Sequence, residues 1–382
     1  MRILILGGDG YLGWPTAMNL SATGHKVTVV DNYLRRNIML NEDVEPLYSV
    51  PNLDERIRVW KEKSGNIISK FIGDLNQWDF VEKIFRECDP EVIIHYAEQP
   101  SAPYSMLRRE SALLTIGNNI GVTANIIFAI KEFCSDAHLI KLGTMGEYGT
   151  PNIDIEEGWI DLEHKGRKDK FLYPRQAGSL YHTTKIMDTD LLWYYVRMWK
   201  LRVTDLMQGP VYGIFTEESD MDERLLTSFS YDEMFGTVLN RFIVQAVSGH
   251  HLTVYGKGGQ TRGYLNIKDT LNCIRLAVDN PANSGELKIF NQFTETFSVN
   301  ELASKVQIAG KTIGLDIKIK NIDNPRKELE NHYYNPKHTG LLKLGLEPNY
   351  LNNNEMVRML EHVLKHKNNI NTHKIFRGVK WT

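Results

Sequence analysis

The sequence has few cysteines, little net charge and no long apolar run. Its 382 residues contain three cysteines, too few for a disulfide framework, which favours a reducing compartment. The formal net charge of −2 gives no reason to expect nucleic acid or an anionic membrane as a partner. No apolar run approaches the length of a membrane span, and the first predicted strand begins at residue 2, with no signal or transit peptide before it. These absences predict a cytoplasmic protein without membrane insertion.

A metal site is not expected either. His362 and His366 have the spacing of ligands on a helix, but they lie beside Lys365 and Lys367 and lack a nearby third ligand. A solvated helix end explains this pattern better.

Short apolar runs alternate with helical segments in the first half of the chain. This alternation predicts an α/β fold, a Rossmann-type doubly wound parallel sheet. Past residue 209 the loops lengthen, which indicates a smaller α/β substrate-binding lobe. We expect residues 1–208 to form the nucleotide-binding domain, with 261–280 returning to it, and 209–260 and 281–382 to form the lobe.

A glycine-rich turn follows the first apolar run directly. Gly7, Gly10 and Gly13 allow the backbone to turn tightly near a pyrophosphate, and the next helix N-terminus attracts its charge. Asp31 ends the second run, where a carboxylate accepts ribose hydroxyls and repels a 2′-phosphate. NAD is therefore favoured over NADP, although Arg35 and Arg36 lie close enough to leave NADP open, and Asp31 as a mere loop-initiating residue is the alternative.

Tyr181 and Lys185 stand four residues apart in a helical context, so they lie on one face. The ammonium is expected to lower the phenol pKa from its usual value of about 10. Such a tyrosine can take the proton of a sugar hydroxyl while a hydride leaves the same carbon for a nicotinamide. The same spacing at Tyr264–Lys268 is strand-like, and Tyr333–Lys337 contains a proline.

Together with Asp74 and Thr144, these motifs resemble the extended short-chain dehydrogenase/reductase family, the NAD-dependent epimerases and dehydratases of nucleotide sugars. Residues 101–106, 141–158, 253–263, 291–295, 324–326 and 332–335 are similar to members that convert UDP-glucose and sulfite to UDP-sulfoquinovose and water, for sulfolipid or glycan synthesis. The similarity covers essentially the whole chain. It implies an enzyme formally classed as a hydrolase acting on carbon–sulfur bonds, with NAD as its cofactor and UDP-glucose and sulfite as its substrates.

The resemblance also implies roles in the reaction. Tyr181 is the base for the C4 hydroxyl, Lys185 tunes it and holds the nicotinamide ribose, and Thr144 hydrogen-bonds O4. Oxidation at C4 acidifies C5, water leaves from C6, sulfite adds there, and C4 is reduced again. Related dehydratases have an Asp-Glu pair directly after the threonine, where this chain has Met and Gly. Glu147 is the candidate base at C5, or only an orienting residue, and His182 is the candidate acid at O6, or a binding or packing residue.

Further site residues follow from the same resemblance. The cofactor is expected to contact Gly7, Gly10, Tyr11, Leu12, Gly13, Asp31, Asn32, Arg35, Arg36, Asp74, Gln99, Asn118, Lys185 and Val211. The substrate is expected to contact Gln99, Thr144, Tyr181, Gln208, Asn240, Arg241, Thr253, Val254, Tyr255, Arg262 and Arg326, the two last arginines suiting a diphosphate. Pro100 stands where the family usually has an arginine, so Gln99, Arg175 and His182 are the candidates for the sulfonate.

Some alternatives stay open at this point. Residues 153–171 predict a charged hairpin, either a cap over the site or a surface loop. The apolar stretches 126–130 and 191–196 are either core or the face of a homodimer or higher homo-oligomer. The nearest rival activities are a UDP-glucose 4-epimerase and a 4,6-dehydratase. A non-catalytic NAD sensor is a rival of another class.

Overall fold

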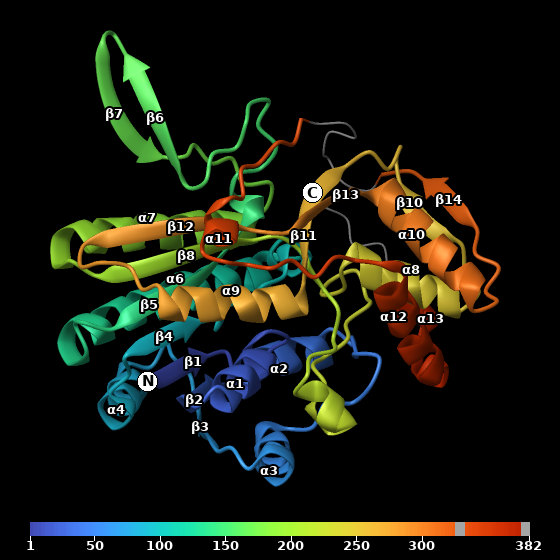
Figure 1. The fold of residues 1–382 in the computed structure, drawn as a ribbon, viewed down its shortest axis with the longest axis horizontal. Coiled ribbons are helices and arrows are strands. Elements are labelled where there is room, and N and C mark those ends of the chain that lie inside the picture. Colours follow the sequence, from blue (N-terminus) through green and yellow to red (C-terminus); the bar gives the residue numbers. More distant parts are fainter. Residues whose placement is uncertain (325–332, 376–382) are drawn as a thin grey trace.

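The structure is a computed structural model of the chain that describes residues 1–324 and 333–375. A seven-stranded sheet dominates it, with helices on both faces. A smaller lobe lies beyond the carboxyl ends of the strands (Figure 1). The strand order is β12-β8-β5-β4-β1-β2-β3, with every neighbouring pair parallel. The strands are β1 (Arg2–Leu6), β2 (Lys26–Asp31), β3 (Ile68–Ile72), β4 (Val92–His95), β5 (His138–Thr144), β8 (Arg202–Gln208) and β12 (Glu286–Gln292). The predicted Rossmann-type fold is confirmed.

The alternation of side chains along β1 explains the two helical layers. Ile3 and Ile5 point to one face and Leu4 and Leu6 to the other, and all four are buried. The first face is covered by α1 (Gly13–Ala22), α3 (Leu53–Ser64) and α9 (Ile267–Asp279). The second is covered by α4 (Trp78–Cys88), α6 (Arg109–Phe133) and α7 (Leu180–Trp199).

The long helix α6 corrects one expectation. Its 25 residues are long and apolar enough to span a membrane, although the sequence was expected to hold no such run. Half of its most apolar window is buried, and it packs between α4 and α7. This burial identifies α6 as a core helix of the layer.

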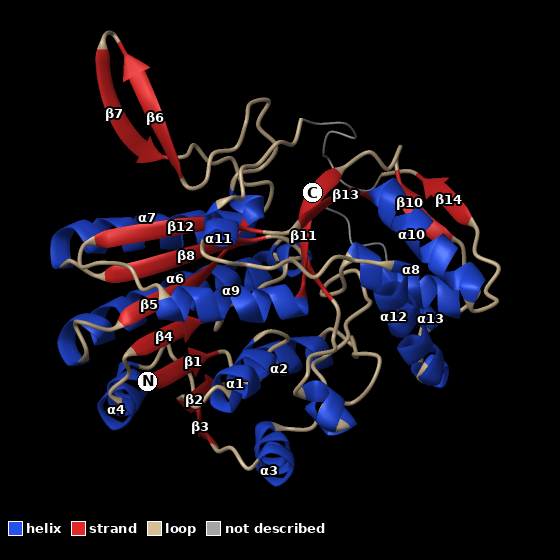
Figure 2. Cartoon of the chain, in the orientation of Figure 1, coloured by secondary structure: helices blue, strands red, loops and turns tan. Residues whose placement is uncertain are grey.

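The lobe combines small sheets with a cluster of helices (Figure 2). Its strands are β9 (Val211–Tyr212), β10 (Leu252–Tyr255), β11 (Thr261–Asn266), β13 (Glu295–Ser298) and β14 (Ile319–Ile322). Its main helices are α8 (Val238–Val247), α10 (Val299–Thr312) and α12 (Asn353–Lys365), which share one apolar core. The short helices elsewhere are α2 (Leu34–Asn41), α5 (Ala102–Ser105), α11 (Gly340–Lys343) and α13 (Thr372–Ile375).

The division between the two parts differs from the expected one at β12. This strand falls within the segment 281–382 that was expected in the lobe, but it pairs with β8 along its whole length in the large sheet. Helix α9 packs on α1, and β11 pairs with β9 and β13. The chain therefore crosses between the sheet and the lobe more than once.

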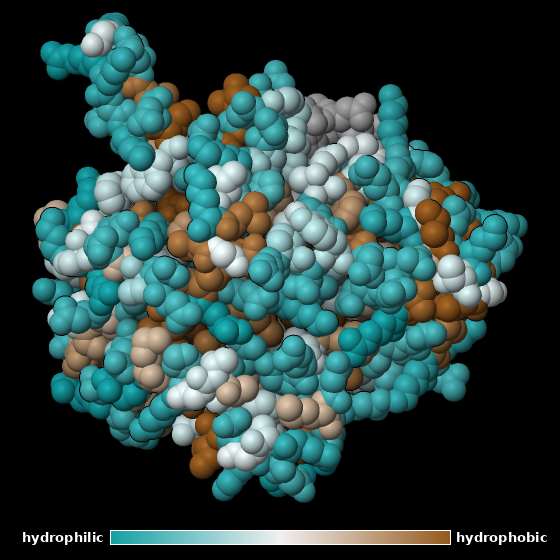
Figure 3. Space-filling view, viewed as in Figure 1, coloured by the Kyte–Doolittle hydropathy of each residue, from teal (hydrophilic) through white to brown (hydrophobic). Residues whose placement is uncertain are grey.

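The predicted hairpin is present as β6 (Trp159–His164) and β7 (Arg167–Leu172), which turn at Lys165 and Gly166. Both turn residues have positive φ, 51° and 74°. The hairpin projects away from the body, and its surface is mostly hydrophilic with apolar side chains near its base (Figures 1 and 3). None of residues 151–172 lines the cavity described below, so the hairpin does not cap the site in this structure.

Candidate active site

A cavity of about 870 Å³ lies between the carboxyl ends of the parallel strands and the lobe. One end is lined by the glycine loop after β1, and the other by Thr144, Tyr181 and His182 together with lobe residues 233–237. Ligands of open α/β sheets bind at this edge of the sheet. Its volume suits a cofactor and a substrate side by side.

The glycine loop is shaped by close approaches that no side chain permits. Gly7 has a φ of 89°, and a Cβ atom on Gly13 would overlap the carbonyl oxygen of Gly7. Helix α1 begins at Gly13 with no acidic residue in its first turn. The positive end of the helix dipole therefore points at the cavity without a competing carboxylate, as a pyrophosphate requires.

Asp31 completes the cofactor end. Its two oxygens accept hydrogen bonds from the backbone amides of Asp9 (2.8 Å) and Tyr33 (2.7 Å), and burial raises its pKa. Arg36 is held by both carboxylate oxygens of Asp9, at 2.6 and 2.8 Å, and Arg35 donates to the Ser230 hydroxyl. Arg35 and Arg36, which could have bound the 2′-phosphate of NADP, thus already have protein partners. The cofactor end of the cavity therefore fits the ribose diol of NAD.

Most of the predicted cofactor residues line this cavity. They are Gly7, Gly10, Tyr11, Leu12, Gly13, Asp31, Asn32, Arg35, Arg36, Asp74, Asn118 and Val211. Gln99 and Lys185 do not line it. The Gln99 side chain is buried and bonds to Ser101 and Thr115, so it shapes the turn after β4.

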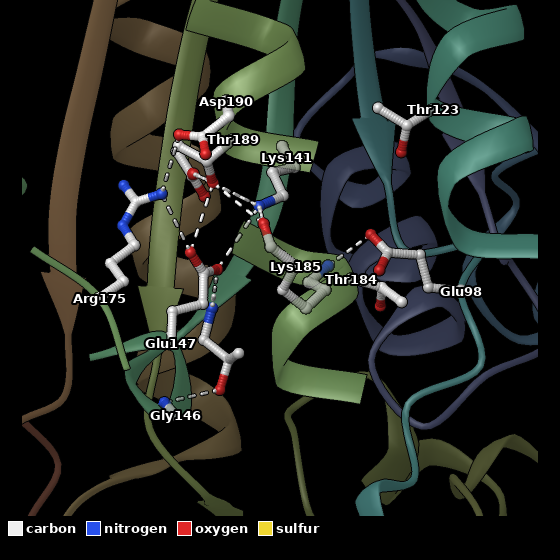
Figure 4. A network of polar contacts seen from close by, with 12 residues as sticks. Glu98, Thr123, Lys141, Gly146, Glu147, Arg175, Thr184, Lys185, Thr189 and Asp190 are labelled. Carbon is white, nitrogen blue, oxygen red and sulfur yellow. Dashed lines mark hydrogen bonds and ion pairs between the residues drawn. The ribbon is translucent and has the colours of Figure 1, made fainter. Parts of the chain in front are cut away.

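Tyr181 lies on the cavity wall, but its pKa is raised rather than lowered as predicted. The Lys185 ammonium forms an ion pair with Glu98, a residue of the turn after β4 (Figure 4). Burial raises the Tyr181 pKa, and the negative charges of Glu98 and Glu147 raise it further. The prediction considered only the lysine on the same helix and missed the carboxylate that neutralises it.

Glu147 is fully buried and does not line the cavity. Its carboxylate lies 3.5 Å from the Lys141 Nζ atom and 3.4 Å from an Arg175 nitrogen, and it accepts a hydrogen bond from the Thr144 amide (Figure 4). Asp205 approaches the same lysine at 3.4 Å. The geometry places Glu147 behind the wall, which favours the orienting alternative over the assignment as base at C5.

His182 fills the place beside Gly146 on the wall. A Cβ atom on Gly146 would overlap the imidazole ring, so the glycine makes room for it. The ring Nδ1 lies 2.9 Å from the Ser179 hydroxyl, the residue that caps α7. Burial, aided by the charge of Arg262, lowers the His182 pKa to about 4, and the ring is therefore neutral near pH 7.

The predicted substrate residues divide into three groups. Gln208 and Asn240 line the cavity together with Thr144 and Tyr181. Arg241 and Tyr255 do not reach the cavity themselves but contact Glu233, which lines it. Glu233 accepts a 2.9 Å hydrogen bond from the Tyr255 hydroxyl and forms an ion pair with Arg241. Predicted residues that do not line the cavity are Gln99, Arg241, Thr253, Val254, Tyr255 and Arg262, and Arg326 is outside the described residues.

The three candidates for binding the sulfonate do not lie together in the cavity. His182 is on the wall, whereas the Gln99 amide is used within its turn and Arg175 faces Glu147. Sequence reasoning missed four carboxylates of the wall, Asp9, Glu45, Glu98 and Glu233. An acidic residue three positions after the end of β4 was the available signal for Glu98.

Known proteins match this chain over most of its length. Residues 3–291 match the model of the NAD dependent epimerase/dehydratase family. The chain belongs to this family. Over its whole length it is 48% identical to UDP-sulfoquinovose synthase, chloroplastic, of Spinacia oleracea, of which it covers 79%. It is 42% identical, again over its whole length, to UDP-sulfoquinovose synthase of Sulfolobus acidocaldarius, of which it covers 98%.

Solved structures of other family members share the fold. UDP-glucose 4-epimerase of Stenotrophomonas maltophila, with bound NAD and a formylated UDP-arabinopyranose, superposes with a TM-score of 0.73 at 16% identity. UDP-glucose 4-epimerase of Thermotoga maritima, with UDP-glucose, gives 0.70 at 20% identity. Each comparison covers 96% of this chain and at least 98% of the other. NAD is the cofactor of the family.

Proposed function

We propose that this chain is a UDP-sulfoquinovose synthase, which converts UDP-glucose and sulfite to UDP-sulfoquinovose and water. The observation that carries the proposal is the juxtaposition of Thr144, Tyr181 and His182 on one wall of the cavity. They supply a hydrogen-bonding hydroxyl, a proton acceptor and a neutral imidazole where C4 and C6 of one hexose can be reached together. The full-length similarity to two synthases supports the same activity.

The first stage is oxidation at C4. When bound, NAD accepts the hydride of C4 and later returns it. Thr144 hydrogen-bonds O4, and Tyr181 takes the proton of the C4 hydroxyl.

The second stage exchanges the C6 hydroxyl for sulfonate. A ketone at C4 acidifies the C5 hydrogen, so hydroxide can leave C6 after C5 has lost its proton. When the Ser179 hydroxyl donates to Nδ1, the neutral His182 ring carries its proton on Nε2 and donates a hydrogen bond to the departing oxygen. Because Glu147 lies behind the wall, Tyr181 acts a second time: it gives the proton that it took from O4 to the departing oxygen, which leaves as water, and accepts the C5 proton in exchange. Sulfite then adds to C6 of the conjugated enone.

A product assay tests this proposal directly. Purified protein is incubated with UDP-glucose, with and without sulfite, and the nucleotide sugars are weighed by mass spectrometry. We expect the sulfonated sugar only with sulfite. A UDP-galactose or 4-keto-6-deoxy product with sulfite present would identify an epimerase or dehydratase instead, and no conversion at all would favour a sensor.

The helices α6 and α7 present an exposed apolar face, which we assign to a homodimer. Its large exposed side chains are Leu113, Ile116, Phe128, Met187, Tyr194 and Met198. Met198→Glu should convert a dimer to a monomer in light scattering, because a charge would be buried in the interface. Ile308→Glu, on the exposed surface of α10, is the matched control and should change nothing. A wild-type protein that is monomeric at micromolar concentration would contradict the assignment. The cytoplasmic location stays a prediction.

A further inference from the structure

Asp9 places a second carboxylate beside Asp31 at the cofactor end of the cavity. Both residues line the cavity, and the Asp9 backbone amide donates to Asp31 Oδ2 at 2.8 Å. The Asp9 side chain is 9% exposed, so its charge lies largely inside the protein. A charge in such a place needs cationic partners, and two arginines supply them.

Arg36 is the partner that lines the cavity, and it lies in the first turn of α2. Its Nε and Nη2 atoms donate to the two Asp9 carboxylate oxygens at 2.6 and 2.8 Å. Its Nη1 and Nη2 atoms also donate to the carbonyls of Val50 and Pro51 at 2.7 and 2.8 Å. These contacts use four of the five N–H donors of the guanidinium. Arg36 therefore has little capacity left for a ligand.

Arg56 is the other partner, and it lies behind the cavity. Its side chain is fully buried over the Trp14 ring, 4.8 Å from the ring centroid, and does not line the cavity. It donates to the Asp9 carboxylate, while its Nε and Nη1 atoms have no hydrogen-bond partner among the described residues. Arg56 thus fixes the Asp9 carboxylate from behind, and that carboxylate holds Arg36 in front.

The 2′-phosphate of the adenosine ribose distinguishes NADP from NAD. Dinucleotide folds that accept this phosphate use an arginine near the end of the second strand. We propose that Asp9 is a positioning residue that sets the choice of cofactor by keeping Arg36 from that phosphate. Asp31 repels the phosphate, and Asp9 withholds the cation that would compensate for the repulsion. The choice is made whatever sugar the protein binds.

Competition between the two cofactors measures this choice without catalysis. Purified protein is incubated with equal concentrations of NAD and NADP until radiolabelled NAD shows complete exchange. The bound dinucleotides are then released by denaturation and quantified by chromatography. The wild type should retain NAD almost exclusively. Asp9→Ala should move the bound ratio toward NADP by about tenfold or more, because the freed guanidinium can form a charge-assisted pair with the phosphate.

Asp54→Ala is the control for loss of a carboxylate. Asp54 is an exposed residue of α3 that forms an ion pair with Lys70, and neither residue lines the cavity. Its removal should leave the ratio of bound NAD to NADP unchanged.

Two further substitutions in the Asp9→Ala protein separate the role of Arg36 from that of net charge. Each removes one positive charge, Arg36→Gln from the cavity wall and Arg56→Met from behind it. Arg36→Gln should restore the preference for NAD, whereas Arg56→Met should keep the shift toward NADP. Arg56→Met also removes the buried charge that Asp9→Ala leaves without a partner. If the single variant does not fold, Arg36→Gln is therefore added to the Asp9→Ala/Arg56→Met protein instead.

Other results would overturn the inference. A wild-type ratio in the folded Asp9→Ala or Asp9→Ala/Arg56→Met protein would leave Asp31 as the determinant of cofactor choice. Equal weakening of both cofactors leaves the ratio unchanged and would show a structural role only. A shift toward NADP that persists after Arg36→Gln, or that disappears after Arg56→Met, would assign the effect to net charge.

Discussion

The first turn of helix α7 and the turns that follow it serve different tasks. The first turn presents Tyr181 and His182 to the cavity. The following turns meet buried charges from the sheet: Lys141 donates to the Lys185 carbonyl at 3.1 Å, and Thr189 donates to Asp205 at 2.7 Å (Figure 4). The first turn therefore performs chemistry, and the following turns fix its position. Substitutions in the two parts should separate activity from stability.

The largest effect is expected in the first turn of α7. Tyr181→Phe should lower kcat by about 10³-fold, because the ring still packs but can no longer exchange a proton. Calorimetry should show nearly unchanged UDP-glucose binding. Tyr194→Phe, exposed on the same helix, is the control and should keep wild-type turnover. Near-normal turnover in Tyr181→Phe would place the base elsewhere.

The buried contacts of the following turns should respond in the opposite way. Burial alone lowers the Lys141 pKa, but Asp205 and Glu147 outweigh it and raise that pKa, so the lysine stays charged inside the protein. Glu147→Gln removes one of its two carboxylates and should lower the free energy of unfolding by about 3 kcal/mol. Deuterium exchange at C5 should continue in the folded fraction of the variant. Exchange that stops while NADH still forms would restore Glu147 as the base.

Gly146→Ala sharpens the comparison beside the first turn. The added methyl group would displace the His182 ring without touching Tyr181 directly. Sulfonated product should form about tenfold more slowly or worse, since a misplaced hydrogen-bond donor slows the elimination. NADH should still appear when UDP-glucose is added alone. Product formation at the wild-type rate would show that the ring position does not matter.

A smaller effect is expected from a buried histidine outside the catalytic wall. His138 lies on β5 with Nε2 2.9 Å from the Thr204 hydroxyl, and burial lowers its pKa from 6.5 to about 3. Between these values the unfolded chain binds a proton that the folded protein excludes, so stability is present above pH 6.5 and declines as the pH falls. The slope is about 1.4 kcal/mol per pH unit. Denaturant unfolding of His138→Gln should show a shallower decline, and an unchanged slope would contradict it.

The sequence allowed us to predict those site residues that belong to short contiguous motifs. The glycine loop, Asp31 and Tyr181 each sit in a contiguous pattern at the end of a strand or on one helix, and the structure brings them to one cavity. It did not predict contacts between distant segments, because no local pattern records them. Glu98 meets Lys185 across 87 residues, and the Gly146 backbone makes room for a ring 36 positions later.

The same reason explains why some of the predicted substrate residues do not line the cavity. Thr253 and Val254 belong to a stretch whose similarity to relatives is clear, but the structure uses them inside the lobe. The Thr253 hydroxyl accepts a 2.7 Å hydrogen bond from Gln245, and Val254 is part of the lobe core. A matching stretch thus indicates a shared fold around the site as readily as contact with the ligand.

The fate of the C4 hydrogen tests the central claim most directly. UDP-glucose carrying deuterium at C4 is converted with sulfite in ordinary water, and the product is analysed by NMR and mass spectrometry. The account predicts a sulfonated sugar that keeps its deuterium at C4, because the hydride leaves that carbon and returns to it within one closed site. A sulfonated product with protium at C4 would contradict the account.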